Sequence, residues 1–197
     1  MATAARRVGA EGSATRAAIL DATEALIREL GYGAVSTRKV AARAGLKPSL
    51  VHYYFPTTED LLLAMSKRGA DESDRMIEEA LAAPNPLRAL WGFLTDTSRT
   101  GISLEFMAMA NHRKSLRAHM AEHCEAMRRR EVEVFTRLLG DRLDKELGIP
   151  PTVLSLTLTG IGRMLTMEGA LGVTEGHAEA RAYVENLLDR LAPDSTG

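Results

Sequence analysis

The chain has 197 residues, 45% of them hydrophobic and only 5% aromatic, which is enough apolar sequence to build a substantial core. Ala, Leu, Arg and Glu are plentiful and alternating β-branched runs are missing, so the composition predicts an all-α protein. The formal net charge is −1, but residues 1–60 carry eight Lys/Arg and six Asp/Glu, so a basic head precedes an acidic body. No stretch approaches the roughly 18 apolar residues of a membrane span, and no apolar signal core follows the N-terminal arginines. The lone Cys124 excludes a framework of internal disulfides. We therefore expect a cytoplasmic protein.

The first helix is expected over residues 13–30, where apolar side chains follow amphipathic spacing up to Gly31. Residues 1–12, which precede it, lack such spacing and are expected to form a mobile tail. Arg6 and Arg7 in this tail either stay solvated or act as a basic arm on DNA. The first helix is well placed to supply the third wall of a small helical core.

Residues 36–55 predict a helix-turn-helix. Ser36 is a good N-cap for a first short helix, Gly45 is a good C-cap, and Pro48 suits the first turn of a second helix. Four cations and no carboxylate lie between residues 36 and 58, which predicts contact with a polyanion. We expect the second helix to face DNA. The same helix pair also occurs as a plain αα-hairpin within helical bundles.

Helices are expected to fill the rest of the chain. A long one is expected from Glu59 to about Ala83, capped by Thr57 or Thr58 and stopped by proline. Helical spacing then continues over residues 87–94, over 102–109 after a break at Gly101, and over 115–139 with Arg128, Arg129 and Arg130 on the exposed face.

The last two helices are the expected subunit interface. Residues 152–171 are apolar on nearly all sides, so this helix must be buried on nearly all sides. The final helix, about residues 177–191, carries a narrower apolar stripe. Pairing with their copies in a second chain, the two helices would form a four-helix bundle, which predicts a homodimer.

Five short motifs follow one another between Thr15 and Leu62: Ile-Leu-x-Ala-Thr, Gly-Tyr-Gly, Ser-Thr-Arg-Lys-Val-Ala, Ala-Gly-Leu and Val-His-Tyr-Tyr-Phe. This segment, about a quarter of the chain, resembles the DNA-binding region of TetR-family transcriptional regulators. The resemblance implies a homodimer whose N-terminal heads sit in successive major grooves and whose C-terminal domain binds a small effector. With the helical pattern it predicts a tail over residues 1–12, a DNA-binding domain over 13–60, and a helical effector-binding and dimerisation domain over 61–197.

The resemblance also implies roles for single residues. Ser36 corresponds to a helix cap that meets a phosphate, Arg38 to a phosphate or base contact, and Phe55 to a buried anchor. Two positions depart from the family pattern: Tyr54 stands where His is frequent, and Thr58 stands where Lys is usual. Because the cation is missing at Thr58, we expect weaker phosphate binding at that position. The full set of candidate DNA contacts is Ser36, Thr37, Arg38, Lys47, Pro48, Ser49, His52, Tyr53, Tyr54 and Thr58.

Candidate effector-pocket residues lie in the second half of the chain. Its methionines and aromatic residues at helical spacing predict either an adaptable apolar pocket or ordinary core packing. Glu168, in the apolar helix, either orients a polar ligand group or faces a partner subunit or solvent. The candidates are Trp91, Phe93, Phe106, Met109, Met120, His123, Met127, Met164 and Glu168.

A histidine-rich stretch offers a second kind of site. His119 and His123 are spaced i, i+4 and so share a helix face, a spacing compatible with zinc or nickel, with His112 and Cys124 nearby. No carboxylate-rich partner motif accompanies them, so neither a metal nor another cofactor is assigned.

The favoured prediction is a ligand-responsive repressor that binds palindromic operator DNA. One alternative is a helical architectural DNA-binding protein without an effector. An enzyme is a more distant alternative, because the chain has no P-loop, nucleophile elbow, dinucleotide-binding glycine set or His-Glu-x-x-His helix.

Overall fold

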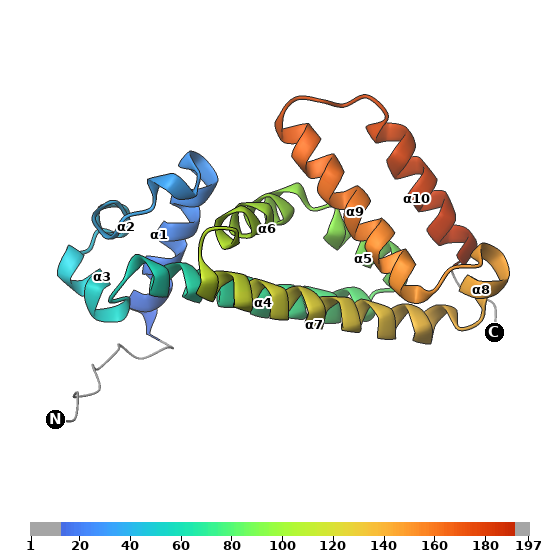
Figure 1. Ribbon diagram of the computed structural model, residues 1–197, viewed down its shortest axis with the longest axis horizontal. Helices are drawn as coiled ribbons and strands as arrows, with labels where there is room; N and C mark the ends of the chain where they lie inside the picture. Colours follow the sequence, from blue (N-terminus) through green and yellow to red (C-terminus); the bar gives the residue numbers. More distant parts are fainter. Residues whose placement is uncertain (1–12, 192–197) are drawn as a thin grey trace. The chain divides into compact units, whose positions relative to one another are not determined.

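The computed structural model describes residues 13–191, and across this range the chain forms ten α-helices, one short 3-10 helix and no strand (Figure 1). This confirms the predicted all-α class. The expected tail with Arg6 and Arg7 lies outside the described residues. The elements are α1 (Ala14–Leu30), η1 (Tyr32–Ala34), α2 (Thr37–Ala44), α3 (Pro48–Tyr54), α4 (Thr58–Leu81), α5 (Pro86–Leu94), α6 (Thr97–Ala110), α7 (Lys114–Leu139), α8 (Arg142–Leu147), α9 (Pro151–Ala170) and α10 (His177–Leu191).

The chain divides into two compact units that alternate along the sequence. Unit 1 comprises the residues up to Gly69 together with residues 105–120, and unit 2 comprises residues 70–104 and those from Ala121 onward. Helices α4, α6 and α7 are therefore each divided between the two units. The sequence predicts a single boundary after residue 60 and gives no sign that residues 105–120 belong with the first three helices.

Unit 1 is organised on α1, whose buried side chains form one stripe that includes Ile19, Leu26 and Ile27. Ser13 caps this helix, since its Oγ accepts the Arg16 backbone N–H at 3.1 Å. Helix α1 packs against α2, and α2 packs against α3, so α1 supplies the third wall that the sequence predicts.

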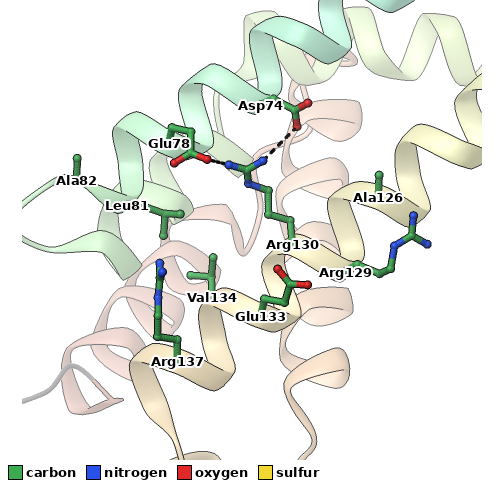
Figure 2. A pocket seen from close by; sticks show the side chains of 10 residues that line it. All are labelled: Asp74, Glu78, Leu81, Ala82, Ala126, Arg129, Arg130, Glu133, Val134 and Arg137. Carbon is green, nitrogen blue, oxygen red and sulfur yellow. Dashed lines mark ion pairs between the residues drawn. The ribbon is translucent and has the colours of Figure 1, made fainter.

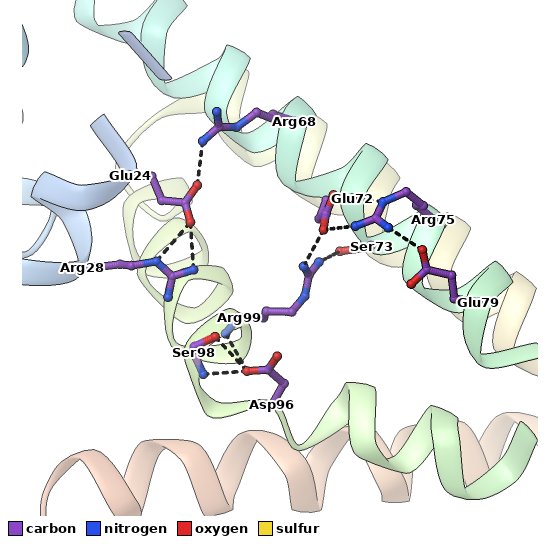
Figure 3. Close-up of polar contacts among 10 residues, drawn as sticks. All are labelled: Glu24, Arg28, Arg68, Glu72, Ser73, Arg75, Glu79, Asp96, Ser98 and Arg99. Atoms are coloured by element: carbon purple, nitrogen blue, oxygen red, sulfur yellow. Dashed lines mark hydrogen bonds and ion pairs between the residues drawn. The ribbon is translucent and has the colours of Figure 1, made fainter. Parts of the chain in front are cut away.

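An ion-pair network joins α1 to the N-terminal half of α4 within unit 1. The Arg68 guanidinium on α4 donates to Asp21 Oδ1 at 2.5 Å and to Glu24 Oε2 at 2.6 Å. Figure 3 shows Glu24 between Arg68 and Arg28, from which it also accepts. Partly exposed pairs are worth up to about 1 kcal/mol each, so their main effect is to fix how these two helices lie.

The core of unit 2 is formed mainly by α5, α7, α9 and α10, with Phe135, Leu154 and Leu188 among its fully buried side chains. Helix α9 passes α5 at very close range: a Cβ atom added at Gly162 would lie 2.4 Å from the carbonyl oxygen of Leu94. Only glycine allows this approach, so the α5–α9 contact depends on a missing side chain.

The expected helix break at Gly101 is wrong. Helix α6 runs through Gly101 without interruption, and the break lies earlier, at Asp96. The Asp96 carboxylate accepts the backbone N–H groups of Ser98 at 3.0 Å and Arg99 at 3.4 Å, which satisfies the first turn of α6 (Figure 3). Burial raises the pKa of Asp96, but these hydrogen bonds and the one from the Ser98 hydroxyl outweigh it and leave the pKa lowered.

Two further expectations in the second half need correction. The sequence prediction misses the short helix α8. Gly148 caps its C-terminal end in the left-handed conformation, with a φ of 59°. The arginine run is not one exposed face: Arg129 is exposed, but Arg128 and Arg130 are half-buried. Arg128 donates to Ser155 at 2.8 Å, and Arg130 pairs with Glu78 and Asp74.

Helix α9 is buried on only one side in the single chain, contrary to the expectation of burial on nearly all sides. Leu154, Leu158 and Leu165 are buried against unit 2, and α10 lies alongside (Figure 1). The opposite face of α9 carries the exposed apolar residues Val153, Leu156, Met164 and Met167, and exposed Leu171 directly follows the helix. These five residues are called the α9 stripe below.

Candidate nucleic-acid interface

The helix-turn-helix is confirmed, and its caps explain its geometry. The Ser36 hydroxyl accepts the Lys39 backbone N–H at 3.4 Å at the start of α2. Gly45 ends α2 in the left-handed conformation, with φ 68° and ψ 27°, and the Leu46 N–H bonds back to the Ala41 carbonyl at 2.9 Å. Pro48, whose fixed φ suits a helix start, is the first residue of α3.

Helix α3 has one buried side and one free side. Val51 is buried, as is Phe55 at the end of the helix, and the Arg16 guanidinium lies 5.3 Å from the Phe55 ring centroid. The free side is formed by exposed residues of the predicted contact set: Lys47, Pro48, Ser49, His52 and Tyr53. Donors and acceptors that can read base edges are thus gathered on the solvent side of one short helix.

The two tyrosines at the end of α3 support each other. Their rings meet edge to face with centroids 5.3 Å apart, Tyr54 being half-buried and Tyr53 exposed. Packing of this kind holds an aromatic ring while leaving its phenol oxygen accessible. The Tyr53 hydroxyl is therefore available to a phosphate oxygen.

One of the four cations in the basic patch is already paired. The Arg43 guanidinium donates to the Glu29 carboxylate of α1 at 2.5 Å, and this hydrogen bond holds the pKa of Glu29 below its usual value. In the described part of the chain, no ion pair involves Arg38, Lys39 or Lys47. The cationic surface offered to DNA is therefore smaller than the sequence suggests.

The remaining predicted contacts lie at helix starts. Ser36 and Thr37 are half-buried at the first turn of α2, and Arg38 is exposed beside them. At the start of α4 the cap is Thr57, whose hydroxyl accepts the Asp60 N–H at 3.0 Å, and not Thr58, which is the half-buried first residue of the helix.

Residues 19–65, which cover this helix-turn-helix and the start of α4, match the family described as "Bacterial regulatory proteins, tetR family". This segment of the chain is similar to the DNA-binding region of the TetR family. The match supports a DNA-binding regulator.

Comparisons over most of the chain give one regulator of similar sequence and solved structures of similar fold. The chain is 27% identical over 176 residues to the HTH-type transcriptional regulator BetI of Rhizobium meliloti (strain 1021), covering 89% of this chain and 76% of BetI. The fold is similar to a TetR transcription regulator from Haloarcula marismortui ATCC 43049, with a TM-score of 0.72, 20% identity, and 91% and 98% of the two chains covered. It is also similar to the multidrug binding protein EbrR complexed with imidazole, with a TM-score of 0.61, 23% identity, and 93% and 98% covered.

The predicted effector-pocket residues are divided between the two units. Phe106, Met109 and Met120 are buried in unit 1. In unit 2, Trp91 belongs to the main core cluster, and Phe93 and Met127 pack against it. The structure therefore brings Trp91, Phe93 and Met127 to one core.

The other three candidates lie elsewhere in unit 2. His123 is half-buried on α7, and Met164 is exposed as part of the α9 stripe. Glu168 lies 2.9 Å from His177 Nε2, so its carboxylate already has a hydrogen-bonding partner at the start of α10. This contact gives Glu168 a role that the sequence does not suggest, which is to join α9 to α10.

A charged groove of about 730 Å³ lies between α4 and α7 in unit 2 (Figure 2). It is lined by the charged residues Asp74, Glu78, Arg129, Arg130, Glu133 and Arg137 and by apolar residues that include Leu81 and Val134. None of the nine predicted pocket residues lines this groove.

Glu131 is a buried carboxylate that the sequence prediction overlooks. It is 5% exposed on α7 and accepts a hydrogen bond from the Ser155 hydroxyl of α9, which in turn accepts from Arg128. Burial raises the pKa of Glu131, against the lowering effect of Ser155, Arg128 and Arg163. A signal was present, since Glu131 follows Met127 by four residues and precedes Val134 by three on the apolar stripe.

Replacing Glu131 by Gln is expected to stabilise unit 2 at neutral pH. A carboxyl whose pKa is raised in the folded state adds most stability below its unfolded pKa, and this contribution is lost as pH rises through the folded pKa. Glutamine keeps a hydrogen-bond acceptor without the buried charge. Urea unfolding followed by Trp91 fluorescence should give a higher midpoint for Glu131→Gln at pH 8, with the difference shrinking toward pH 4.5. A lower midpoint at pH 8 would show that the ionised carboxylate is needed.

The histidine stretch does not converge. Within residues 13–191, no group of three or more His, Cys, Asp or Glu side chains is arranged to hold a metal ion. His112 is exposed in the turn before α7, and the other three lie along α7. Among the same residues, no helix is both long and apolar enough to cross a membrane.

Proposed function

We propose that this chain is a homodimeric, effector-responsive repressor of the TetR family that acts in the cytoplasm on palindromic operator DNA. The observation that carries the proposal is α3: it is anchored by buried Val51 and Phe55, while Lys47, Ser49 and Tyr53 stay exposed on its other side. In functional terms, residues 13–60 read DNA, and residues 61–197 hold the effector and the partner subunit.

The dimer contact is assigned to α9 and α10. The α9 stripe leaves five large apolar side chains exposed in the single chain, and Tyr183 on α10 is 62% exposed. A contiguous apolar face of this kind is typical of a subunit interface and is costly when left in water. Pairing with a second copy would bury it in a four-helix bundle.

The effector site is assigned to the helical body, and its leading candidates are Trp91, Phe93 and Met127, which the structure brings to one core. Trp91, Phe93 and Met127 around the core of unit 2 support an apolar ligand, and the likeness to EbrR, described as a multidrug binding protein, is compatible with a small organic one. Bound effector would favour a dimer state whose two heads no longer match successive major grooves, so the operator is released by a shift of populations.

The test is a binding titration with the DNA upstream of the chain's own gene. Fluorescence anisotropy should show at least about a thousandfold preference for one palindrome over a random duplex of the same length. Equal affinity for both would instead identify an architectural DNA-binding protein. Compounds that release the palindrome without unfolding the protein would then be the effectors.

Tyr53→Phe is expected to weaken operator binding by about 0.5–1.5 kcal/mol, because one hydrogen bond to a phosphate is lost while the ring still packs on Tyr54. The sequence preference should not change, since phosphate contacts carry no base information. A gel-shift titration against the palindrome and its single-base variants measures both effects. Unchanged affinity would remove Tyr53 from the contact set.

A further inference from the structure

Residues 111–117, at the turn between α6 and α7, carry a basic cluster far along the sequence from the helix-turn-helix. His112 and Arg113 lie in the turn itself, and Lys114 and Arg117 lie in the first turn of α7. No carboxylate lies between Glu105 and Glu122. Although the second half of the chain is acidic, this turn belongs to unit 1, together with the DNA-reading helices.

Two contacts place the turn beside the start of α4. The Ser115 hydroxyl donates to the Glu59 carboxylate in the first turn of α4, and the Ser66 hydroxyl lies 3.2 Å from Met120 Sδ further along. Ser66 and Met120 are both buried, so the beginning of α7 is packed along the N-terminal half of α4.

The start of α4 is close to α3 in the chain. Tyr54, the last residue of α3, is four residues from Thr58, a distance of at most about 14 Å. The major groove that receives a recognition helix is about 12 Å wide and is bordered by phosphates on both sides. A cation beside the first turn of α4 is therefore near the border of the groove that α3 enters.

The charges in unit 1 favour the same partner. Residues 13–69 and 105–120 carry eleven Lys/Arg and six Asp/Glu, a formal +5, whereas the rest of the chain sums to −6. The turn thus raises the positive charge of the unit that meets DNA, where a polyanion is attracted most strongly.

The cations of this cluster differ in how their side chains are held: Arg113 is half-buried, whereas Lys114 and Arg117 are exposed. Arg117 donates to the carbonyl oxygens of Ala110 at 3.1 Å and Asn111 at 2.5 Å, so it closes the end of α6. Among the described residues, no hydrogen bond or ion pair involves the side chain of Arg113 or Lys114. Buried Leu116 and Met120 already hold the segment in unit 1.

We infer that the α6–α7 turn is a second phosphate-binding element of each head, with Lys114 and Arg113 contacting the DNA backbone beside the groove occupied by α3. The inference rests on the DNA-binding function proposed above. Because such contacts are made to phosphates, they add affinity on any sequence and leave the choice of operator to α3.

The test compares salt dependence of binding for Lys114→Ala, Lys114→Arg and a matched control, Lys67→Ala. Lys67 is an exposed lysine in the same unit, eight residues beyond Glu59 on α4. Losing one phosphate contact per head lowers the salt slope of a dimer by about 1.8. Between 50 and 200 mM salt, the wild-type advantage over Lys114→Ala should therefore shrink about tenfold, on palindrome and random duplex alike.

Lys114→Arg should keep the wild-type slope, and Lys67→Ala should leave it unchanged. The inference is overturned if Lys114→Ala keeps the wild-type slope, or if Lys67→Ala lowers it equally, since that would be a diffuse effect of net charge. Loss of affinity with an unaltered slope would also overturn it, because it would show a structural role for Lys114. A wild-type protein that prefers no palindrome would instead contradict the proposed repressor function, which separates the two failures.

Discussion

Gly162→Ala is expected to destabilise unit 2 by about 3 kcal/mol, because the new Cβ atom would lie 2.4 Å from the Leu94 carbonyl oxygen. The obstacle is backbone at the end of α5 and no rotamer change removes it, so α5 and α9 must move apart. Trp91 is the only tryptophan in the chain and lies in the core of unit 2, next to this contact in sequence. Urea unfolding followed by its fluorescence therefore measures the affected unit directly.

Gly169→Ala provides the matched control for Gly162→Ala. Gly169 lies seven residues further along α9, and a Cβ atom there would meet no other heavy atom within 4 Å. Alanine is about 1 kcal/mol better than glycine inside a helix, so this variant should be as stable as the wild type or slightly more stable. Equal stability of the two variants would show that α5 adjusts to the extra methyl group.

Leu156→Glu is expected to convert the dimer into monomers and to weaken operator binding at least about a hundredfold, because two linked heads bind far better than one. Leu156 is 54% exposed in the middle of the α9 stripe, so the single chain tolerates a charge there. In a dimer the same carboxylate would be buried without a partner, which is strongly unfavourable. Sedimentation equilibrium gives the oligomeric state, and anisotropy titration gives the affinity.

Leu30→Glu is the control for Leu156→Glu. Leu30 is 61% exposed at the end of α1, so the change in charge and exposure is similar but lies outside α9 and α10. This variant should remain dimeric. A dimeric Leu156→Glu protein would place the subunit interface on another surface.

The helix-turn-helix could be predicted closely from the sequence because each of its ends depends on one local signal. Ser36, Gly45 and Pro48 act through hydrogen bonds or backbone angles within a few residues, so their identities suffice. The charge balance is less local: Glu29 neutralises Arg43 across 14 residues, and the sequence alone does not show that pairing.

The second half was harder to predict because its signals are ambiguous. Gly101 interrupts the pattern of apolar spacing and suggests a helix end, yet α6 continues through it because Asp96 provides a better start five residues earlier. Similarly, the apolar α9 has one side packed in unit 2 and another exposed. Helical periodicity shows which residues share a face but does not show which neighbour covers that face.

Glu131 and residues 105–120 illustrate contacts that no local pattern specifies. The partner of Glu131 is Ser155, on another helix, and the carboxylate lies within an otherwise apolar stripe. The partner of Ser115 is Glu59, 56 residues away. Pairs so far apart in sequence can be predicted only when the packing of the helices is known. The sequence therefore predicts one boundary after residue 60 and does not place residues 105–120 with the first helices.

The contact of Met120 with Ser66 has a consequence for biosynthesis. Proteins emerge from the ribosome N-terminus first, and a unit folds completely only when its last segment is available. Helices α1 to α3 can assemble early, but the head lacks the beginning of α7 until Met120 has been synthesised, when 120 of the 197 residues exist. A shortened gene product ending after residue 69 would thus carry a recognition helix on an incomplete support, with Ser66 and its apolar neighbours uncovered.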